Sequence, residues 1–230
     1  MSKETGLVIF DSDGVLVDSE PIASRVLADV LTDFGFATSS RDAIDRYTGI
    51  SLKAVLAKIE AEWGHPLPDE FAATLRQRDV AAFQAELQPM PGVLETLEAL
   101  DRLNVAKCVA SSGTPAKLRV TLGVSNLSRC FEPHIFSAEM VERGKPAPDL
   151  FLYAAERMDV RPDACVVIED SVPGIKAAQA AGMRSFGFIG GGHVPPDLGT
   201  TLIKAGAALV FAQMTDLPGL LARTGCIRRE

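Results

Sequence analysis

GLVIFDSDGVLVDSE, residues 6–20, gives the clearest indication of the fold in this sequence. Leu7–Phe10 is a short apolar run rich in β-branched residues, typical of a strand buried on both faces of a parallel sheet. Asp11 and Asp13 follow this run directly, and Gly14 comes next. In extended backbone, residues two apart point to the same side, so the two carboxylates should converge. We therefore expect an acidic site at the end of a central strand, where open α/β sheets bind ligands. A solvated acidic turn is the plainer alternative.

The composition is that of a folded globular protein. The chain has 230 residues, 47% of them hydrophobic, and a net charge of −7. This acidic balance argues against nucleic acid and against an anionic membrane surface as partners. The four cysteines are scattered and form no CxxC pair, so we expect free thiols in a reducing compartment. We find no signal peptide and no stretch long enough to span a membrane, and we expect a cytoplasmic monomer.

Helical and strand patterns divide the chain into two parts. From residue 18 to about residue 86, apolar residues recur at helical spacing and no strand pattern interrupts them. From residue 91 onward, short apolar runs alternate with helical segments, which predicts a parallel sheet with helices on both faces. We therefore predict an α/β protein with a Rossmann-like, doubly wound core, residues 1–17 and 87–230, and an inserted all-helical domain, residues 18–86.

Polar side chains stand where the predicted strands end. Ser111 and Ser112 follow the second strand, Lys145 lies in the loop GKPAPD, and Glu169 and Asp170 follow the fourth strand. Individually these residues could be a turn serine, a surface lysine and a helix cap. In a parallel sheet, however, these loops share one edge, so we expect the side chains to meet the acids of the first strand. The acids suit a hard divalent cation, and the serine and lysine suit a phosphate, so Mg²⁺ bridging a phosphoryl group is the simplest interpretation.

The segments FDSDGVLVDSE, VASSG, GKPAPDLF and VIEDSVPGIKAAQAAG, in this order, resemble the haloacid dehalogenase-like superfamily, in particular its β-phosphoglucomutase-like phosphatase branch with a helical cap. The resemblance spans nearly the whole chain. It implies that Asp11 is a nucleophile forming an aspartyl-phosphate, and that Asp13 protonates the leaving oxygen and then activates water. It also implies that Lys145 keeps Asp11 ionised. The implied phosphate-binding residues are Ser111, Ser112 and Lys145, and the implied ligands of Mg²⁺ are Asp11, the backbone carbonyl of Asp13, Glu169 and Asp170.

The same resemblance makes residues 18–86 a cap that closes over the site and excludes water. In similar proteins the loop corresponding to residues 48–53 contacts the part of the substrate remote from the phosphate. This implies substrate-specificity roles for Gly49, Ser51 and Lys53. Ser51 could instead cap the following helix, and Lys53 could be a solvated surface lysine.

The expected activity is hydrolysis of a small phosphorylated metabolite, such as a sugar, polyol or short-acid phosphate. A phosphomutase is the first alternative. Mutases of this branch use a histidine and an arginine of the cap, and those positions fall here on Ala23 and Leu52, which favours hydrolysis. Dehalogenase and phosphonatase activities are disfavoured because those enzymes lack the second acid, Asp13. A receiver-like phosphoacceptor without turnover is the alternative from another class, although the helical insertion and the order Ser, Lys, Glu-Asp argue against it.

Overall fold

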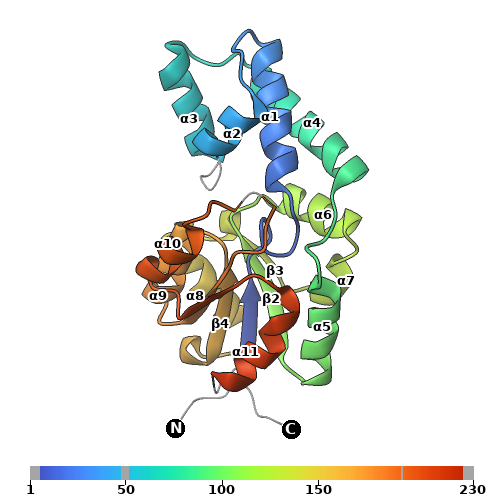
Figure 1. Ribbon diagram of the computed structural model, residues 1–230, viewed down its shortest axis with the longest axis vertical. Coiled ribbons are helices and arrows are strands. Elements are labelled where there is room, and N and C mark those ends of the chain that lie inside the picture. Colours follow the sequence, from blue (N-terminus) through green and yellow to red (C-terminus); the bar gives the residue numbers. More distant parts are fainter. Residues whose placement is uncertain (1–5, 48–51, 193, 225–230) are drawn as a thin grey trace. The chain divides into compact units, whose positions relative to one another are not determined.

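The computed structural model describes residues 6–47, 52–192 and 194–224. The chain forms two compact units, Met1–Asp18 with Gln88–Glu230 and Ser19–Leu87. The first unit is built around a β-sheet, and the second contains helices, with no strand among its described residues (Figure 1). The predicted fold class, an α/β core with an all-helical insertion, is confirmed.

Among the described residues, the strands form one parallel sheet in the order β3-β2-β1-β4-β5-β6. The strands are β1 (Leu7–Phe10), β2 (Ala106–Ser111), β3 (Ile135–Ser137), β4 (Cys165–Glu169), β5 (Arg184–Phe188) and β6 (Leu209–Phe211). The chain builds outward from β1 to β3 and then returns to the other side of β1 with β4. The strand order thus reverses between β1 and β4, and the carboxyl ends of such strands form the crevice where doubly wound sheets bind ligands.

Helices cover both faces of this sheet (Figure 1). One face carries α8 (Asp149–Arg157), α9 (Val172–Ala180) and α10 (Leu198–Ala205). The other side of the sheet carries α5 (Val93–Arg102), α6 (Pro115–Val124), α7 (Ser128–Phe131) and α11 (Leu217–Arg223). Short 3-10 turns occur at η1 (Ala138–Met140), η2 (Pro162–Ala164) and η3 (Met214–Asp216).

The central strands are buried on both faces. Every residue of β1 and of β4 is buried, as the apolar runs predict for all of them except the charged Glu169 that ends β4. Ile9 lies opposite Cys108 on one side and Val167 on the other, and its exposed fraction is 0%. The end of β1 is therefore held by a packed core and by backbone hydrogen bonds to two neighbouring strands.

The second unit has a small apolar core of its own. Its helices are α1 (Glu20–Asp33), α2 (Ser40–Tyr47), α3 (Leu52–Trp63) and α4 (Phe71–Glu86). Leu31, Ile59 and Phe71 are among its buried core residues. Ion pairs from Arg25 to Glu86 (2.7 Å) and from Arg78 to Asp33 (2.6 Å) join α1 and α4. Because these ion pairs are exposed, the apolar contacts provide most of the stability.

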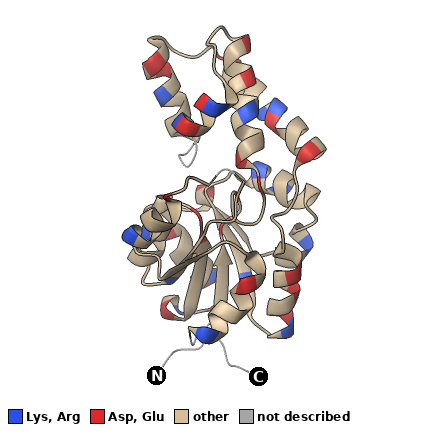
Figure 2. Cartoon of the chain, in the orientation of Figure 1, with Lys and Arg blue, Asp and Glu red and all other residues tan. Residues whose placement is uncertain are grey.

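Charged residues of both signs are interspersed over the helices of both units (Figure 2). Among the residues that the structure describes, no helix combines the length and the apolar character needed to cross a membrane.

We predict that Ile9→Ala lowers the free energy of unfolding by ~2–5 kcal/mol, because it leaves a cavity in the apolar core that the sheet shares with α8. Leu152→Ala is the matched control, since Leu152 lies on α8 with 39% of its surface exposed. That change should cost less than about 1 kcal/mol. Urea unfolding followed by circular dichroism measures both, and equal losses would contradict the buried position of β1.

Candidate active site

Asp11 and Asp13 lie immediately beyond β1, where the backbone leaves the sheet. The N–H of Asp11 donates to the carbonyl of Ile168 (3.0 Å), which extends the pairing with β4 by one residue. The N–H of Gly14 donates to the carbonyl of Val17 (2.9 Å) and closes a tight turn after Asp13. Both acids are thus carried by backbone that is hydrogen-bonded on each side.

Lys145 joins the ends of three strands. Its Nζ atom lies 2.8 Å from Oδ1 of Asp11 and 2.7 Å from Oε1 of Glu169. The same atom donates to the carbonyl of Ala110 in β2 at 3.0 Å. Only 4% of the lysine side chain is exposed, and none of the Glu169 side chain. Buried charges are tolerated when they are paired and hydrogen-bonded, so these groups stabilise one another's burial.

Burial and neighbouring charges shift the pKa values of Asp11 and Lys145. Burial raises the pKa of Asp11 above its ordinary value, the Lys145 ammonium opposes that shift, and the Glu169 carboxylate adds to it. For Lys145, burial alone would lower the pKa, but Asp11 and Glu169 outweigh it and raise the pKa overall. Lys145 therefore stays protonated, and further positive charge near Asp11 would favour its ionised form.

Asp11, Glu169 and Asp170 form an acidic cluster in which one ligand atom from each lies within 4.8 Å of the others. Two glycines make room for it. A Cβ atom at Gly14, where φ is +75°, would lie 1.9 Å from Oδ2 of Asp170. A Cβ atom at Gly174 would lie 1.8 Å from Oε1 of Glu169. Carboxylate oxygens gathered at this spacing are the donor set that a hard divalent cation prefers, so the residues present fit a metal ion.

The second oxygen of Glu169 fixes the start of α9. Its Oε2 atom accepts from the N–H (2.9 Å) and the hydroxyl (2.8 Å) of Ser171. The Ser171 hydroxyl oxygen in turn caps α9 by accepting from the N–H of Gly174 (3.1 Å). Glu169 is therefore oriented by Lys145 on one side and by a helix start on the other.

The predicted phosphate-binding serines follow the neighbouring strand. Ser111 ends β2 and is buried, and its hydroxyl oxygen accepts from the N–H of Gly113 at 3.1 Å. The hydroxyl of Ser137 donates to the carbonyl of Gly113 at 2.7 Å. Ser112, which lies between Ser111 and Gly113, is exposed. The structure thus brings Ser111 to the same sheet edge as Asp11 and Lys145, in a loop held by its own hydrogen bonds.

Lys117 was not among the residues that the sequence singled out. Its Nζ atom lies 2.8 Å from Oδ2 of Asp13, and 33% of the lysine side chain and 17% of the Asp13 side chain are exposed. Thr114 caps α6 by accepting from the N–H of Lys117 at 3.2 Å. The sequence does carry a signal for it. The pair Thr114-Pro115, after the loop Ser111-Ser112-Gly113, predicts the start of a helix and places Lys117 in its first turn.

Two of the three predicted specificity residues, Gly49 and Ser51, lie outside the described residues. Lys53 lies in the first turn of α3, and its side chain is also outside the description. Their roles therefore stay predictions.

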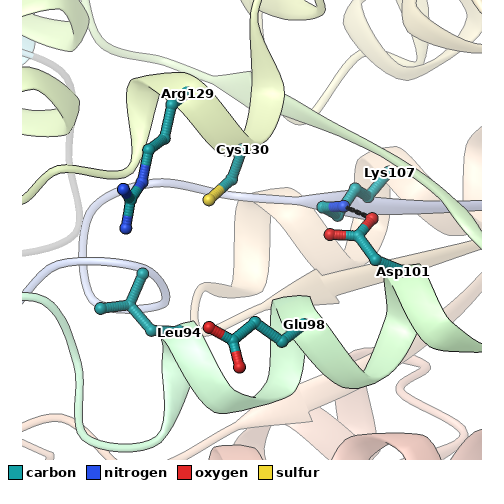
Figure 3. A pocket seen from close by; sticks show the side chains of 6 residues that line it. All are labelled: Leu94, Glu98, Asp101, Lys107, Arg129 and Cys130. Atoms are coloured by element: carbon teal, nitrogen blue, oxygen red, sulfur yellow. Dashed lines mark hydrogen bonds and ion pairs between the residues drawn. The ribbon is translucent and has the colours of Figure 1, made fainter.

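A surface pocket of about 510 Å³ lies elsewhere on the sheet unit (Figure 3). It is lined by Leu94, Glu98, Asp101, Lys107, Arg129 and Cys130. Lys107, which is ion-paired with Asp101 in Figure 3, stands near the beginning of β2, whereas Ser111 stands at its end. The two residues are four positions apart along the strand, or roughly 13 Å, so this pocket is distinct from the acidic cluster.

Comparison with known proteins identifies the family. The family model described as haloacid dehalogenase-like hydrolase matches residues 5–182. The chain belongs to the haloacid dehalogenase-like hydrolase family. A second model, described as HAD-hydrolase-like, matches residues 142–226.

Curated members of the family similar to this chain are phosphatases. The chain is 31% identical to 6-phosphogluconate phosphatase of Escherichia coli over 219 residues, which cover 95% of each protein. It is also 31% identical to hexitol phosphatase B of Escherichia coli, over 77% of this chain and 80% of that relative. A solved HAD family hydrolase of Deinococcus radiodurans, with bound phosphate and sodium, is 34% identical, with a TM-score of 0.82 and coverage of 100% of both chains. The expectation of a phosphatase of this family is confirmed.

We predict that Gly14→Ala weakens binding of a divalent cation, because the new methyl group displaces the Asp170 carboxylate. The matched control is Gly64→Ala, since Gly64 also has a positive φ (+82°) but nothing within 4 Å of its Cβ position. Both changes should lower the free energy of unfolding by ~1–2 kcal/mol through backbone strain. Only Gly14→Ala should reduce Mg²⁺ affinity, by ~10- to 100-fold, as measured by titration calorimetry. Equal Mg²⁺ affinity in the two variants would contradict the proposed cation site.

Proposed function

We propose that the protein hydrolyses the phosphate monoester of a small metabolite, with Mg²⁺ as cofactor and an aspartyl-phosphate on Asp11 as intermediate. The observation that carries this proposal is the buried Lys145 ammonium, 2.8 Å from Asp11 and 2.7 Å from Glu169, with Asp170 in the same acidic cluster. A carboxylate is a weak nucleophile, but the acyl phosphate that it forms is readily cleaved by water.

In the first step, an Asp11 oxygen attacks phosphorus, and the bond from phosphorus to the ester oxygen breaks. Asp13 donates a proton to that leaving oxygen. In the second step, Asp13 takes a proton from water, the water oxygen attacks phosphorus, and the Asp11 carboxylate is released with inorganic phosphate. Lys145 stabilises the negative charge on Asp11 before attack and on the phosphoryl oxygens during transfer.

The phosphoryl group would be held by Ser111, Ser112 and Lys145. The Mg²⁺ ligands would be Asp11, the backbone carbonyl of Asp13, Glu169 and Asp170. When bound there, Mg²⁺ offsets the negative charge of the transferring group. The bound phosphate in the similar Deinococcus radiodurans hydrolase supports a phosphate site in this fold.

The proposed substrate is a phosphorylated sugar, sugar acid, polyol or short acid. Similarity to 6-phosphogluconate phosphatase and to hexitol phosphatase B supports this class. We also propose that residues 18–86 act as the cap over a catalytic core of residues 1–17 and 87–230. Gly49, Ser51 and Lys53 of the cap would contact the part of the substrate remote from the phosphate.

We predict steady release of phosphate from at least one ester in a panel of sugar, polyol and short-acid phosphates with Mg²⁺. Excess EDTA and, separately, Asp11→Asn should each abolish this release, because the first removes the cation and the second removes the nucleophile. Phosphate measured by a colorimetric assay gives the result. Full turnover in EDTA would contradict the cofactor, and a single equivalent without turnover would favour a receiver-like phosphoacceptor.

We predict hydrolysis rather than isomerisation of hexose phosphates. The positions where a mutase carries its histidine and arginine are Ala23 in α1 and Leu52 in α3, and neither side chain can form a hydrogen bond. Neither residue could tie the activation of Asp13 to a bound sugar, so Asp13 could activate water before a sugar hydroxyl returns. Incubation with β-glucose 1-phosphate and a bisphosphate primer should therefore yield free phosphate in excess. Glucose 6-phosphate accumulating faster than phosphate would establish the mutase instead.

A further inference from the structure

The ion pair between Lys117 and Asp13 is separate from the buried Lys145 cluster. Lys117 lies on α6, which begins just after the loop Ser111-Ser112-Gly113, and its Nζ atom lies 2.8 Å from Oδ2 of Asp13. Both side chains are partly exposed, in contrast to the buried pair of Lys145 and Glu169. The two acids that follow β1 are thus each matched with a different lysine.

The backbone of Lys117 is held on both sides. Its N–H donates to the capping hydroxyl of Thr114 (3.2 Å), and its carbonyl accepts from the hydroxyl of Thr121 (3.1 Å). Its neighbour Leu118 is buried, with 2% of its surface exposed. The ammonium group therefore reaches Asp13 from a backbone position that hydrogen bonds hold at the start of α6.

We propose that Lys117 is a positioning residue for Asp13: its ammonium group holds the carboxylate in the orientation from which it transfers protons. This proposal rests on the proposed phosphatase function. A carboxylate can rotate about two side-chain bonds, whereas proton transfer requires hydrogen-bond distance to the reacting oxygen. Because a partly exposed ion pair adds little to folding stability, loss of Lys117 should reduce activity with little effect on the fold.

The test variant is Lys117→Met, with Arg119→Met as the matched control. Arg119 is an exposed cation on the same helix, two residues further on. Lys117→Met should lower the steady-state rate by ~10- to 100-fold, since a well-placed acid–base group contributes ~10²- to 10⁴-fold. Arg119→Met should keep the wild-type rate. Lys117→Arg should recover most of the rate, because a guanidinium group can also bind the Asp13 carboxylate.

Rapid mixing with p-nitrophenyl phosphate separates positioning from a merely structural effect. Nitrophenolate leaves as a stable anion and needs no proton, whereas hydrolysis of the phosphoenzyme still needs Asp13 as base. Lys117→Met should therefore release nitrophenolate in a fast burst equal to the enzyme concentration, followed by slow turnover. Thermal unfolding of the same variant should match that of Arg119→Met. Equal slowing of both phases, or a lower melting temperature than Arg119→Met, would overturn the positioning role.

A double-mutant comparison tests whether Lys117 acts through Asp13. On the Asp13→Asn background, Lys117→Met should add almost no further loss, because the carboxylate that it positions is already gone. If the rate reductions caused by Lys117→Met and Asp13→Asn multiply in the double variant, or if Lys117→Met only raises KM, Lys117 acts on the substrate directly. The proposal is then wrong. Absence of turnover by the wild-type protein on every ester would instead overturn the proposed phosphatase function.

Discussion

The burial of the Lys145 ammonium group is the constraint on which the site depends. A buried cation requires partners, and here they come from the ends of three neighbouring strands: Asp11, Glu169 and the carbonyl of Ala110. One ammonium group does not balance the three carboxylates of the acidic cluster. The three carboxylates lie close together and two of them are buried, so they repel one another, and a divalent cation would relieve that repulsion. The same arrangement accounts for Gly14 and Gly174, because a side chain at either position would occupy the space of a carboxylate oxygen.

The two acids after β1 are placed in different surroundings although only one residue separates them. Asp11 is beside the buried Lys145, which favours its ionised, nucleophilic form. Asp13 is beside Lys117, in a position that is more open to solvent. In many enzymes two nearby carboxylates have different chemical roles because their surroundings give them different pKa values. In our proposal Asp11 bonds to phosphorus, and Asp13 only moves protons.

The fold and most of the candidate site could be predicted because parallel sheets bring their strand ends to one edge. That rule brought Asp11, Ser111, Lys145 and Glu169 together from four separate segments. It could not predict which acceptors Lys145 binds or that Lys117 reaches Asp13. Both contacts depend on the side-chain conformations of residues that come from different helices and strands. The sequence indicates α10 only weakly, because Gly199 and two threonines interrupt its helical pattern, and burial of Leu202 against Ile175 and Ala207 stabilises the helix instead.

Borohydride trapping shows directly whether Asp11 carries the phosphoryl group. The enzyme is mixed with Mg²⁺ and a substrate that it turns over, then reduced, so that an acyl phosphate becomes an alcohol. We expect homoserine at position 11, detected by peptide mass spectrometry, only when substrate is present. An unmodified Asp11 in an enzyme that is turning over, or trapping at a different residue, would contradict this role of Asp11.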